Sequence, residues 1–126
     1  MIILLDSCIP SEKFTNILAH DDIKLTDPNS VVVFAFDKEL MLYCMQNNIS
    51  YGVDITNVTQ AIYANNMDAR YIFPKKEILK VSQNLADNYM FDSKIIAKIN
   101  SEDEIEKFAL LELDGVIFKD KINNVK

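Results

Sequence analysis

Two stretches of this chain, NNMDARYIFPK at residues 65–75 and LLELDGVIFKD at residues 110–120, repeat one pattern. Each reads as the last turn of a helix, then an Asp and a small residue, then a short β-branched or aromatic run that ends in Ile-Phe. Asp68 and Asp114 are the acidic residues of the two copies, and we expect each of them to end a helix together with the small residue after it. The pattern is typical of a junction between a helix and a buried strand, so its repetition indicates a βα repeat.

Short apolar runs recur along the rest of the chain. Most are continuous rather than alternating, which is typical of strands that are covered on both faces. From residue 31 onward their starts recur about every twenty residues, with helical spacing between them. Such alternation requires right-handed crossovers and a parallel sheet. The expected strands are residues 1–5, 31–36, 50–55, 70–73, 94–99 and 115–118.

The starts of the expected helices support this order. Asp37 precedes the helical segment KELMLYCMQ and is an expected N-cap. Asn57 with Gln60, and Ser101 with Glu104, have the spacing of a capping box. Each of these signals directly follows an expected strand, as a βα repeat requires.

The chain has 126 residues, the length of one domain, and no linker divides it, so we expect a single α/β domain over residues 1–126. A short helix is expected around residues 11–19 and an irregular loop at residues 20–30, where Asp, Pro, Asn and Ser favour turns. The expected architecture is a doubly wound, flavodoxin-like parallel sheet of five or six strands with helices on both faces. A half-sized β/α barrel is the alternative, since a full eight-stranded barrel needs about 200 residues or more.

Composition narrows the classes of function. The net charge is −6 and Arg70 is the single arginine, which argues against nucleic-acid binding because neutralising phosphates requires clustered Lys and Arg. The excess of Lys, Ile and Asn indicates an AT-rich bacterial genome. The apolar start stops at Asp6 without a basic segment before it, so we expect neither a signal peptide nor a membrane span. Cys8 and Cys44 form no metal-binding or redox motif, and a cytoplasmic protein is expected.

Charged residues stand at or near the ends of several expected strands. In an open parallel sheet, ligands bind beyond the carboxyl ends of the strands, where the strand order reverses. Asp6, Asp37, Asp54 and Lys98 can converge there on one acidic edge. Two carboxylates about 4 Å apart repel by roughly 4 kcal/mol at an effective dielectric constant of 20, so such a site needs Lys98, a proton or Mg²⁺. Asp6 and Asp54 are the candidate metal ligands, and no other cofactor is indicated.

Simpler interpretations exist for the same residues. Asp37 fits an N-cap better than a ligand, and Asp6 can cap the turn that follows it. Asp54 lies inside an otherwise apolar strand and needs a partner. Lysines that follow two of the strands can bind an anion at the same edge, although lysines in such places are usually just solvated. These lysines are Lys75, Lys76, Lys119 and Lys121.

Over residues 1–112 the sequence resembles the receiver domains of bacterial response regulators. It shares their length, their βα alternation and their pattern of charged strand ends. The matching residues are Asp6 in IILLDS, Asp54 in YGVDIT and Lys98 in IIAKIN. The resemblance implies a doubly wound fold, with Asp54 as the counterpart of the phospho-acceptor.

The chain also departs from the receiver pattern. Ser7 and Cys8 follow the first Asp where receivers carry a second acidic residue, and Pro74 stands in place of their hydroxyl residue. Ile99 replaces the proline that follows their lysine, and residues 115–118 add a strand. The resemblance therefore describes at most a degenerate receiver.

We expect from these observations a small cytosolic domain that binds a partner protein or a small-molecule ligand. The rival hypothesis is a metal-dependent enzyme or a degenerate receiver-like phospho-acceptor, with Lys98 stabilising a developing negative charge. A remnant of a barrel enzyme would differ from both, because its sheet would be curled so that Asp54 and Lys98 point inward together. The sequence does not name a partner, and it leaves a homodimer open.

Overall fold

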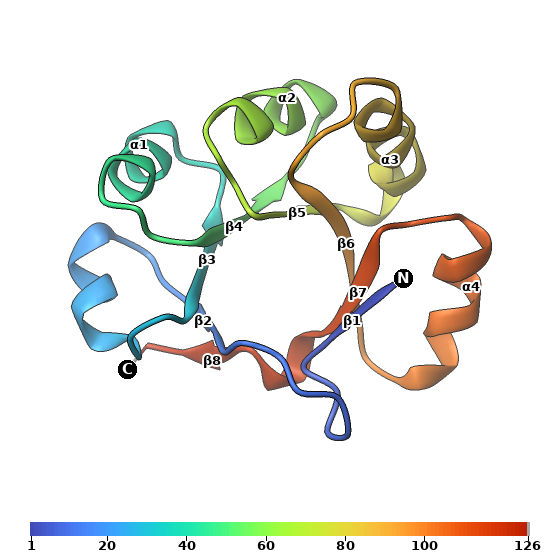
Figure 1. The fold of residues 1–126 in the computed structure, drawn as a ribbon, viewed down its shortest axis with the longest axis horizontal. Helices are drawn as coiled ribbons and strands as arrows, with labels where there is room; N and C mark the ends of the chain where they lie inside the picture. The colour runs from blue at the N-terminus through green and yellow to red at the C-terminus, as the bar shows by residue number, and fades with distance from the viewer. Residues whose placement is uncertain (126) are drawn as a thin grey trace.

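The computed structural model describes residues 1–125 and contains one parallel sheet with helices around it (Figure 1). The strands are β1 (Ile2–Leu4), β2 (Phe14–Asn16), β3 (Val31–Ala35), β4 (Tyr51–Ile55), β5 (Tyr71–Pro74), β6 (Lys94–Ile99), β7 (Gly115–Phe118) and β8 (Asn123–Asn124). The α-helices are α1 (Lys38–Gln46), α2 (Val58–Asn66), α3 (Leu79–Asn88) and α4 (Ile105–Leu110). Short 3-10 helices are η1 (His20–Leu25), η2 (Lys76–Ile78), η3 (Glu102–Glu104) and η4 (Lys119–Lys121).

All six strands predicted from the sequence are present, and none is displaced by more than one residue at either end. The expected helix around residues 11–19 is wrong, because Phe14–Asn16 forms β2 and pairs in parallel with β3. The side chains of Phe14 and Thr15 are buried in this strand. A three-residue strand is too short to show a periodicity, and β8 was missed for the same reason.

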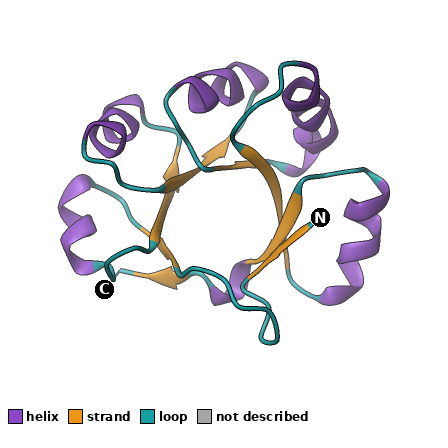
Figure 2. Cartoon of the chain, viewed as in Figure 1, coloured by secondary structure: helices purple, strands orange, loops and turns teal. Residues whose placement is uncertain are grey.

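The sheet has eight strands in the order β1-β7-β6-β5-β4-β3-β2-β8, and all of its pairings are parallel. From β2 to β7 the neighbours follow the chain in sequence, so the order does not reverse between them as it does in a doubly wound sheet. The α-helices lie around the outside of a curled sheet, and within residues 1–125 no α-helix lies inside it (Figure 2). The prediction of a doubly wound sheet of five or six strands, with helices on both faces, is therefore wrong, and the alternative half β/α barrel fits.

Apolar side chains cover both faces of the curled sheet. Outside, they pack between the strands and the helices in two clusters, one around β3 and β4 and the other around β6 and β7. Inside, a separate cluster fills the barrel with Leu4, Phe14, Val31, Val33, Tyr71, Phe73, Ile96, Ile117 and Ile122. This double coverage explains why the strands read as continuous apolar runs.

Both glycines of the chain lie on strands where the interior is tightly packed. A Cβ at Gly115 would lie 2.6 Å from the carbonyl oxygen of Ile2, and a Cβ at Gly52 would lie 2.5 Å from the ring of Phe73. These distances are shorter than van der Waals contact, so only glycine fits without a shift of its neighbours.

All four α-helices end in the same way. In each, the second residue after the helix has a positive φ, and the N–H group of the next residue donates to a carbonyl in the last turn of the helix. At α1, for example, Asn48 has φ 55° and Ile49 donates to Cys44 over 2.9 Å. This is the Schellman arrangement, here built without glycine. The positive-φ residues are Asn48, Asp68, Met90 and Glu112.

The repeated sequence pattern is only half explained as predicted. Asp68 does end α2, with φ 65°, but the corresponding residue after α4 is Glu112 and not Asp114. Asp114 lies beyond the cap, where its carboxylate accepts from the N–H of Ile95 over 2.9 Å. Its own N–H donates to the buried side chain of Gln83 over 2.8 Å. Asp114 therefore joins α3, β6 and β7 instead of ending a helix.

Candidate functional site

An Asp on β4 and a Lys on β6 form an ion pair at the carboxyl ends of these strands, on the inner side of the sheet and across β5, which lies between them. The ammonium of Lys98 on β6 lies 2.7 Å from the carboxylate of Asp54 on β4. Both side chains are half-buried, with 29% and 41% exposed for Lys98 and Asp54. The same ammonium lies 5.2 Å from the centre of the Phe73 ring, which belongs to the interior cluster. The sheet is thus curled with Asp54 and Lys98 pointing inward together, as the barrel hypothesis required.

A pocket of about 450 Å³ opens beside this pair. It is lined by Asp54, Ile55, Thr56, Phe73, Pro74, Lys75, Lys76, Leu79, Lys98, Asn100, Glu104, Lys107 and Phe108. Four of these residues are lysines and two are acidic, so the lining has a net charge of +2. The whole chain carries −6, which makes this pocket an exception to its surroundings.

Glu104 is one of the two carboxylates, and its hydrogen bonds keep it from acting as a free ligand. Its side chain accepts from the N–H groups of Asn100 over 2.7 Å and Ser101 over 3.3 Å. The bond from Asn100, more than any other cause, holds the pKa of Glu104 below its usual range. Glu104 is therefore an anion that caps η3, at the start of the helical segment leading into α4.

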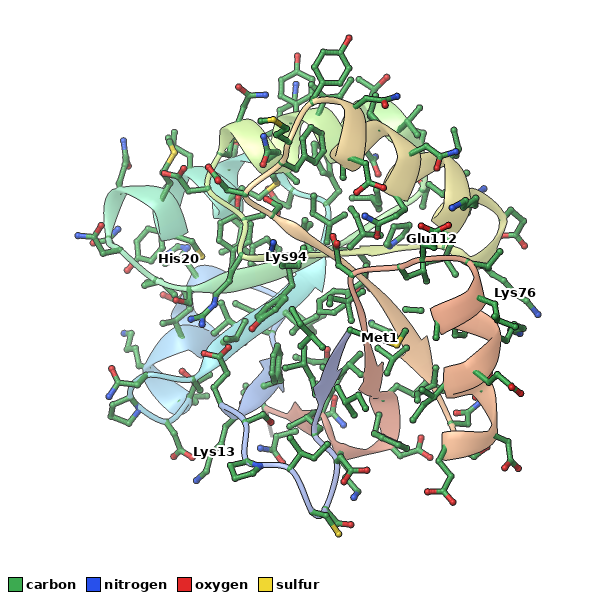
Figure 3. All side chains as sticks on the ribbon, turned by 45° about the vertical axis from the view of Figure 1, so that its right-hand side comes forward. Met1, Lys13, His20, Lys76, Lys94 and Glu112 are labelled. Carbon is green, nitrogen blue, oxygen red and sulfur yellow. The ribbon has the colours of Figure 1, made fainter. Side chains whose placement is uncertain are left out.

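The remaining lysines of the pocket are not neutralised by ion pairs. Within residues 1–125, Lys75, Lys76 and Lys107 form no salt bridge. Lys76 begins η2, the turn that leads into α3, and this turn has no side-chain cap (Figure 3). An uncapped helical N-terminus carries partial positive charge and N–H donors, both of which favour an anion.

The structure does not bring Asp37 to the pocket. Its carboxylate accepts from the N–H groups of Glu39 over 3.0 Å and Leu40 over 3.2 Å, so it is the N-cap of α1. The simpler of the two interpretations of Asp37 is therefore confirmed.

Asp6 lies away from Asp54 along the sheet, because three strands separate β1 from β4. Its carboxylate accepts from the N–H of Cys8 over 2.9 Å and so stabilises the turn after β1. Among residues 1–125 no cluster of three or more His, Cys, Asp or Glu side chains is placed to hold a metal ion. A magnesium site on Asp6 and Asp54 remains a hypothesis, and Lys98 is the cation that the structure places beside Asp54.

The single arginine is engaged at the other end of the barrel. Arg70 lies 3.0 Å from the carboxylate of Glu12, which also accepts from the hydroxyl of Tyr71 over 2.7 Å. Burial, together with this bond to Glu12, raises the pKa of Tyr71 to about 12. With the guanidinium held there, recognition of an anion at the pocket depends on lysines.

Sequence reasoning missed Lys107, and it named Lys75 and Lys76 as residues that can bind an anion but favoured the interpretation that they are solvated. Lys107 reaches the pocket because η3 and α4 turn back over the end of β6, a direction that no residue pattern indicates. A usable signal did exist for the others, because residues that directly follow parallel strands all lie at one edge of the sheet.

A scan against protein-family models and a search of curated proteins both find no match for this chain. Within the described part of the chain, every helix is too short or too polar to cross a bilayer. The chemistry of the pocket is therefore the basis for a functional proposal.

Proposed function

We propose that this protein is a cytoplasmic ligand-binding module whose ligand is a small anion that carries a phosphate group. The observation that carries the proposal is the net positive charge of the pocket at the ends of β4, β5 and β6, within a chain of net charge −6. Ligands of barrel proteins bind at this end of the strands. The volume of the pocket, about 450 Å³, lies within the range of small-molecule sites.

The amount of positive charge favours phosphate over a lone carboxylate. A phosphate group carries about −1.5 to −2 charges at pH 7 and a carboxylate carries one, so a lining with a net charge of +2 attracts phosphate more strongly. Lysine ammonium groups bind phosphate as point charges, without a fixed orientation. The pocket contains lysines and no arginine. The uncapped N-terminal turn Lys76–Ile78 adds N–H donors of the kind that bind phosphate in other folds.

Asp54 gives the pocket a second property. Its carboxylate is paired with Lys98 but its side chain is still 41% exposed, so it has lone pairs to offer a ligand. A hydroxyl group would donate to it, while the phosphate would lie on the side of Lys75, Lys76 and Lys107. The ligand class that fits this arrangement is a phosphate ester with at least one hydroxyl group.

The experiment that tests the proposal is a titration of isotopically labelled protein with inorganic phosphate, followed by amide NMR, with acetate at equal ionic strength as the comparison. We expect saturable shifts at Lys75, Lys76 and Lys107 with phosphate and much smaller shifts with acetate. Lys107→Gln should weaken binding several-fold, because it halves the net charge of a lining that now carries +2.

Lys94→Gln is the matched control for this substitution. Lys94 begins β6 at the opposite end of the barrel, well apart from Lys76 in Figure 3, so its substitution should leave phosphate binding unchanged. Shifts that spread evenly over all lysines without saturating, or an equal effect of the two substitutions, would contradict the proposal.

A further inference from the structure

The outer surface of α1 and α2 is poor in charge. Residues 38–67 contain three charged residues, Lys38, Glu39 and Asp54, although 25% of the whole chain is charged. Asp54 lines the pocket on the inner side of the sheet, so the outer surface carries Lys38 and Glu39, whose charges have opposite signs. A helix that faces only water usually carries charged residues on its outer face, so these helices differ from ordinary surface helices.

Large apolar and aromatic side chains take the place of charges there. Leu42 and Tyr43 on α1 are 42% and 38% exposed, and Ile62 and Tyr63 on α2 are 44% and 43% exposed. Figure 1 shows the two helices as neighbours on the outside of the barrel. These four side chains form what we call the α1–α2 face.

The aromatic rings of the α1–α2 face are held by neighbours instead of moving freely. The ring of Tyr43 lies 5.1 Å from that of His20, which Figure 3 shows beside α1. The ring of Tyr63 lies 3.8 Å from the Lys38 ammonium and 6.4 Å from the ring of Phe36. Rings that are already fixed lose little conformational freedom on association, and Tyr is enriched at the centres of interfaces.

We propose that the α1–α2 face binds the same face of a second copy of this chain. Two copies with a net charge of −6 repel each other, so they approach best through a surface that carries no net charge. A strongly charged partner would find no cluster of opposite charges to pair with there. A patch without net charge is complementary to itself, and a two-fold axis brings identical patches together.

The size of the face sets the strength of the association. Each helix has nine residues. At 1.5 Å per residue and about 10 Å between axes, the pair covers roughly 300 Å² of each copy. Stable interfaces bury about 800 Å² on each partner, so the dimer is weak and forms reversibly as concentration rises.

Sedimentation velocity over protein concentrations from about 10 μM to about 1 mM tests the proposal, since weak interfaces associate in that range. The wild type should show a mass that rises with concentration toward twice that of the monomer. Salt at about 0.5 M should strengthen the association, because it screens the repulsion between copies while the face itself carries no net charge. The doubly substituted Leu42→Glu, Ile62→Glu chain should stay monomeric.

Leu110→Glu on α4 is the matched control, because Leu110 is a helical leucine that is 77% exposed outside the face. It should associate like the wild type, and circular dichroism shows that each variant is folded. A wild type that stays monomeric at the highest concentration overturns the proposal. Binding of that monomer to neutral phosphatidylcholine vesicles, measured in parallel, would not rescue it. Equal loss of association in Leu110→Glu, or growth beyond the dimer, overturns it as well.

Discussion

The Asp54 carboxylate has opposite consequences for an anion site and for a metal site. In the structure it neutralises Lys98 across 2.7 Å, which reduces the positive charge of the pocket. We predict that Asp54→Asn increases the affinity for inorganic phosphate roughly fivefold, since removing a negative charge near a bound anion is worth about 1 kcal/mol in a partly solvated pocket. Amide NMR titrations of the two proteins measure this directly.

Asp37→Asn is the control for that substitution, because Asp37 is an N-cap outside the pocket and an Asn caps nearly as well. It should leave phosphate affinity unchanged. The same samples titrated with Mn²⁺ decide about the metal hypothesis. Saturable binding of Mn²⁺ that is lost in Asp54→Asn, together with weaker phosphate binding, would favour the acidic edge over the anion pocket.

Ser82 on α3 presents a different residue-level question. It is fully buried, and its hydroxyl is the one buried side-chain polar atom without a hydrogen-bond partner in residues 1–125. A buried hydroxyl without a partner costs free energy, and Ala favours a helix more than Ser does. We predict that Ser82→Ala stabilises the protein by about 1 kcal/mol, as measured by urea unfolding.

Ser93 provides the matched control, since it is also buried but its hydroxyl donates to the carbonyl of Ala69. Ser93→Ala should therefore destabilise by about 1 kcal/mol, because the carbonyl loses its donor. If both substitutions shift the free energy of unfolding in the same direction, the presence or absence of a hydrogen-bond partner does not determine whether removing a buried serine hydroxyl stabilises the protein.

At the level of helices and strands, the four glycine-free helix ends leave room for stabilisation. Met90 and Glu112 hold the left-handed conformation, with φ 51° and 60°, which costs a side chain with a Cβ about 1–2 kcal/mol. Glycine relieves this strain, but it also makes the unfolded chain more flexible, and this lowers the free energy of unfolding by part of the amount gained. We predict that Met90→Gly raises the free energy of unfolding by about 0.5–1 kcal/mol.

Asn48→Gly tests the cause of this gain. Asn48 has the same conformation, with φ 55°, but Asn adopts it more readily than Met. The stabilisation should therefore be smaller at Asn48 than at Met90, in the same urea-unfolding measurement. A larger gain at Asn48 would show that backbone strain is not the source.

The positions of the long elements could be predicted because each follows from local chemistry. Helix α1 begins where Asp37 accepts from two backbone N–H groups, and this capping pattern is visible in the sequence. The role of Asp114 could not be predicted in this way, because its partners Ile95 and Gln83 are distant in sequence. The same holds for β2, whose pairing with β3 depends on the whole sheet.

At the scale of the whole molecule, the curl of the sheet could not be predicted from the sequence. Continuous apolar strands show that both faces are covered, but not whether helices or other strands cover the inner face. Here inward residues such as Phe73 and Ile117 pack on one another across the barrel. Asp54 and Lys98 were candidates from the start, and they meet because the curl turns both side chains inward, whereas Asp6 lies three strands away and Asp37 caps α1.

The buried thiol and phenol groups also determine how the stability of the molecule responds to alkaline pH. Burial raises the pKa of the Cys44 thiol from 9.0 to about 11, and that of Tyr71 from 10.0 to about 12 with a contribution from Glu12. Burial also raises the pKa of Tyr51. Because the folded state holds these protons more tightly, their stabilisation is complete below the unfolded pKa values and is lost as pH rises through the folded ones.

We therefore predict that the urea concentration at the midpoint of unfolding is constant near neutral pH. It should begin to fall near pH 9, where the Cys44 thiol of the unfolded chain starts to ionise. It should fall more steeply above pH 10, where the tyrosines of the unfolded chain also ionise. Each group contributes up to about 1.4 kcal/mol per pH unit within its own window. Cys44→Ala should lower stability overall, because it leaves a cavity, but should remove the fall between pH 9 and pH 10. Cys8→Ala, at an exposed position, should keep the wild-type profile, and a profile that stays flat up to pH 11 in the wild type would contradict a buried thiol at Cys44.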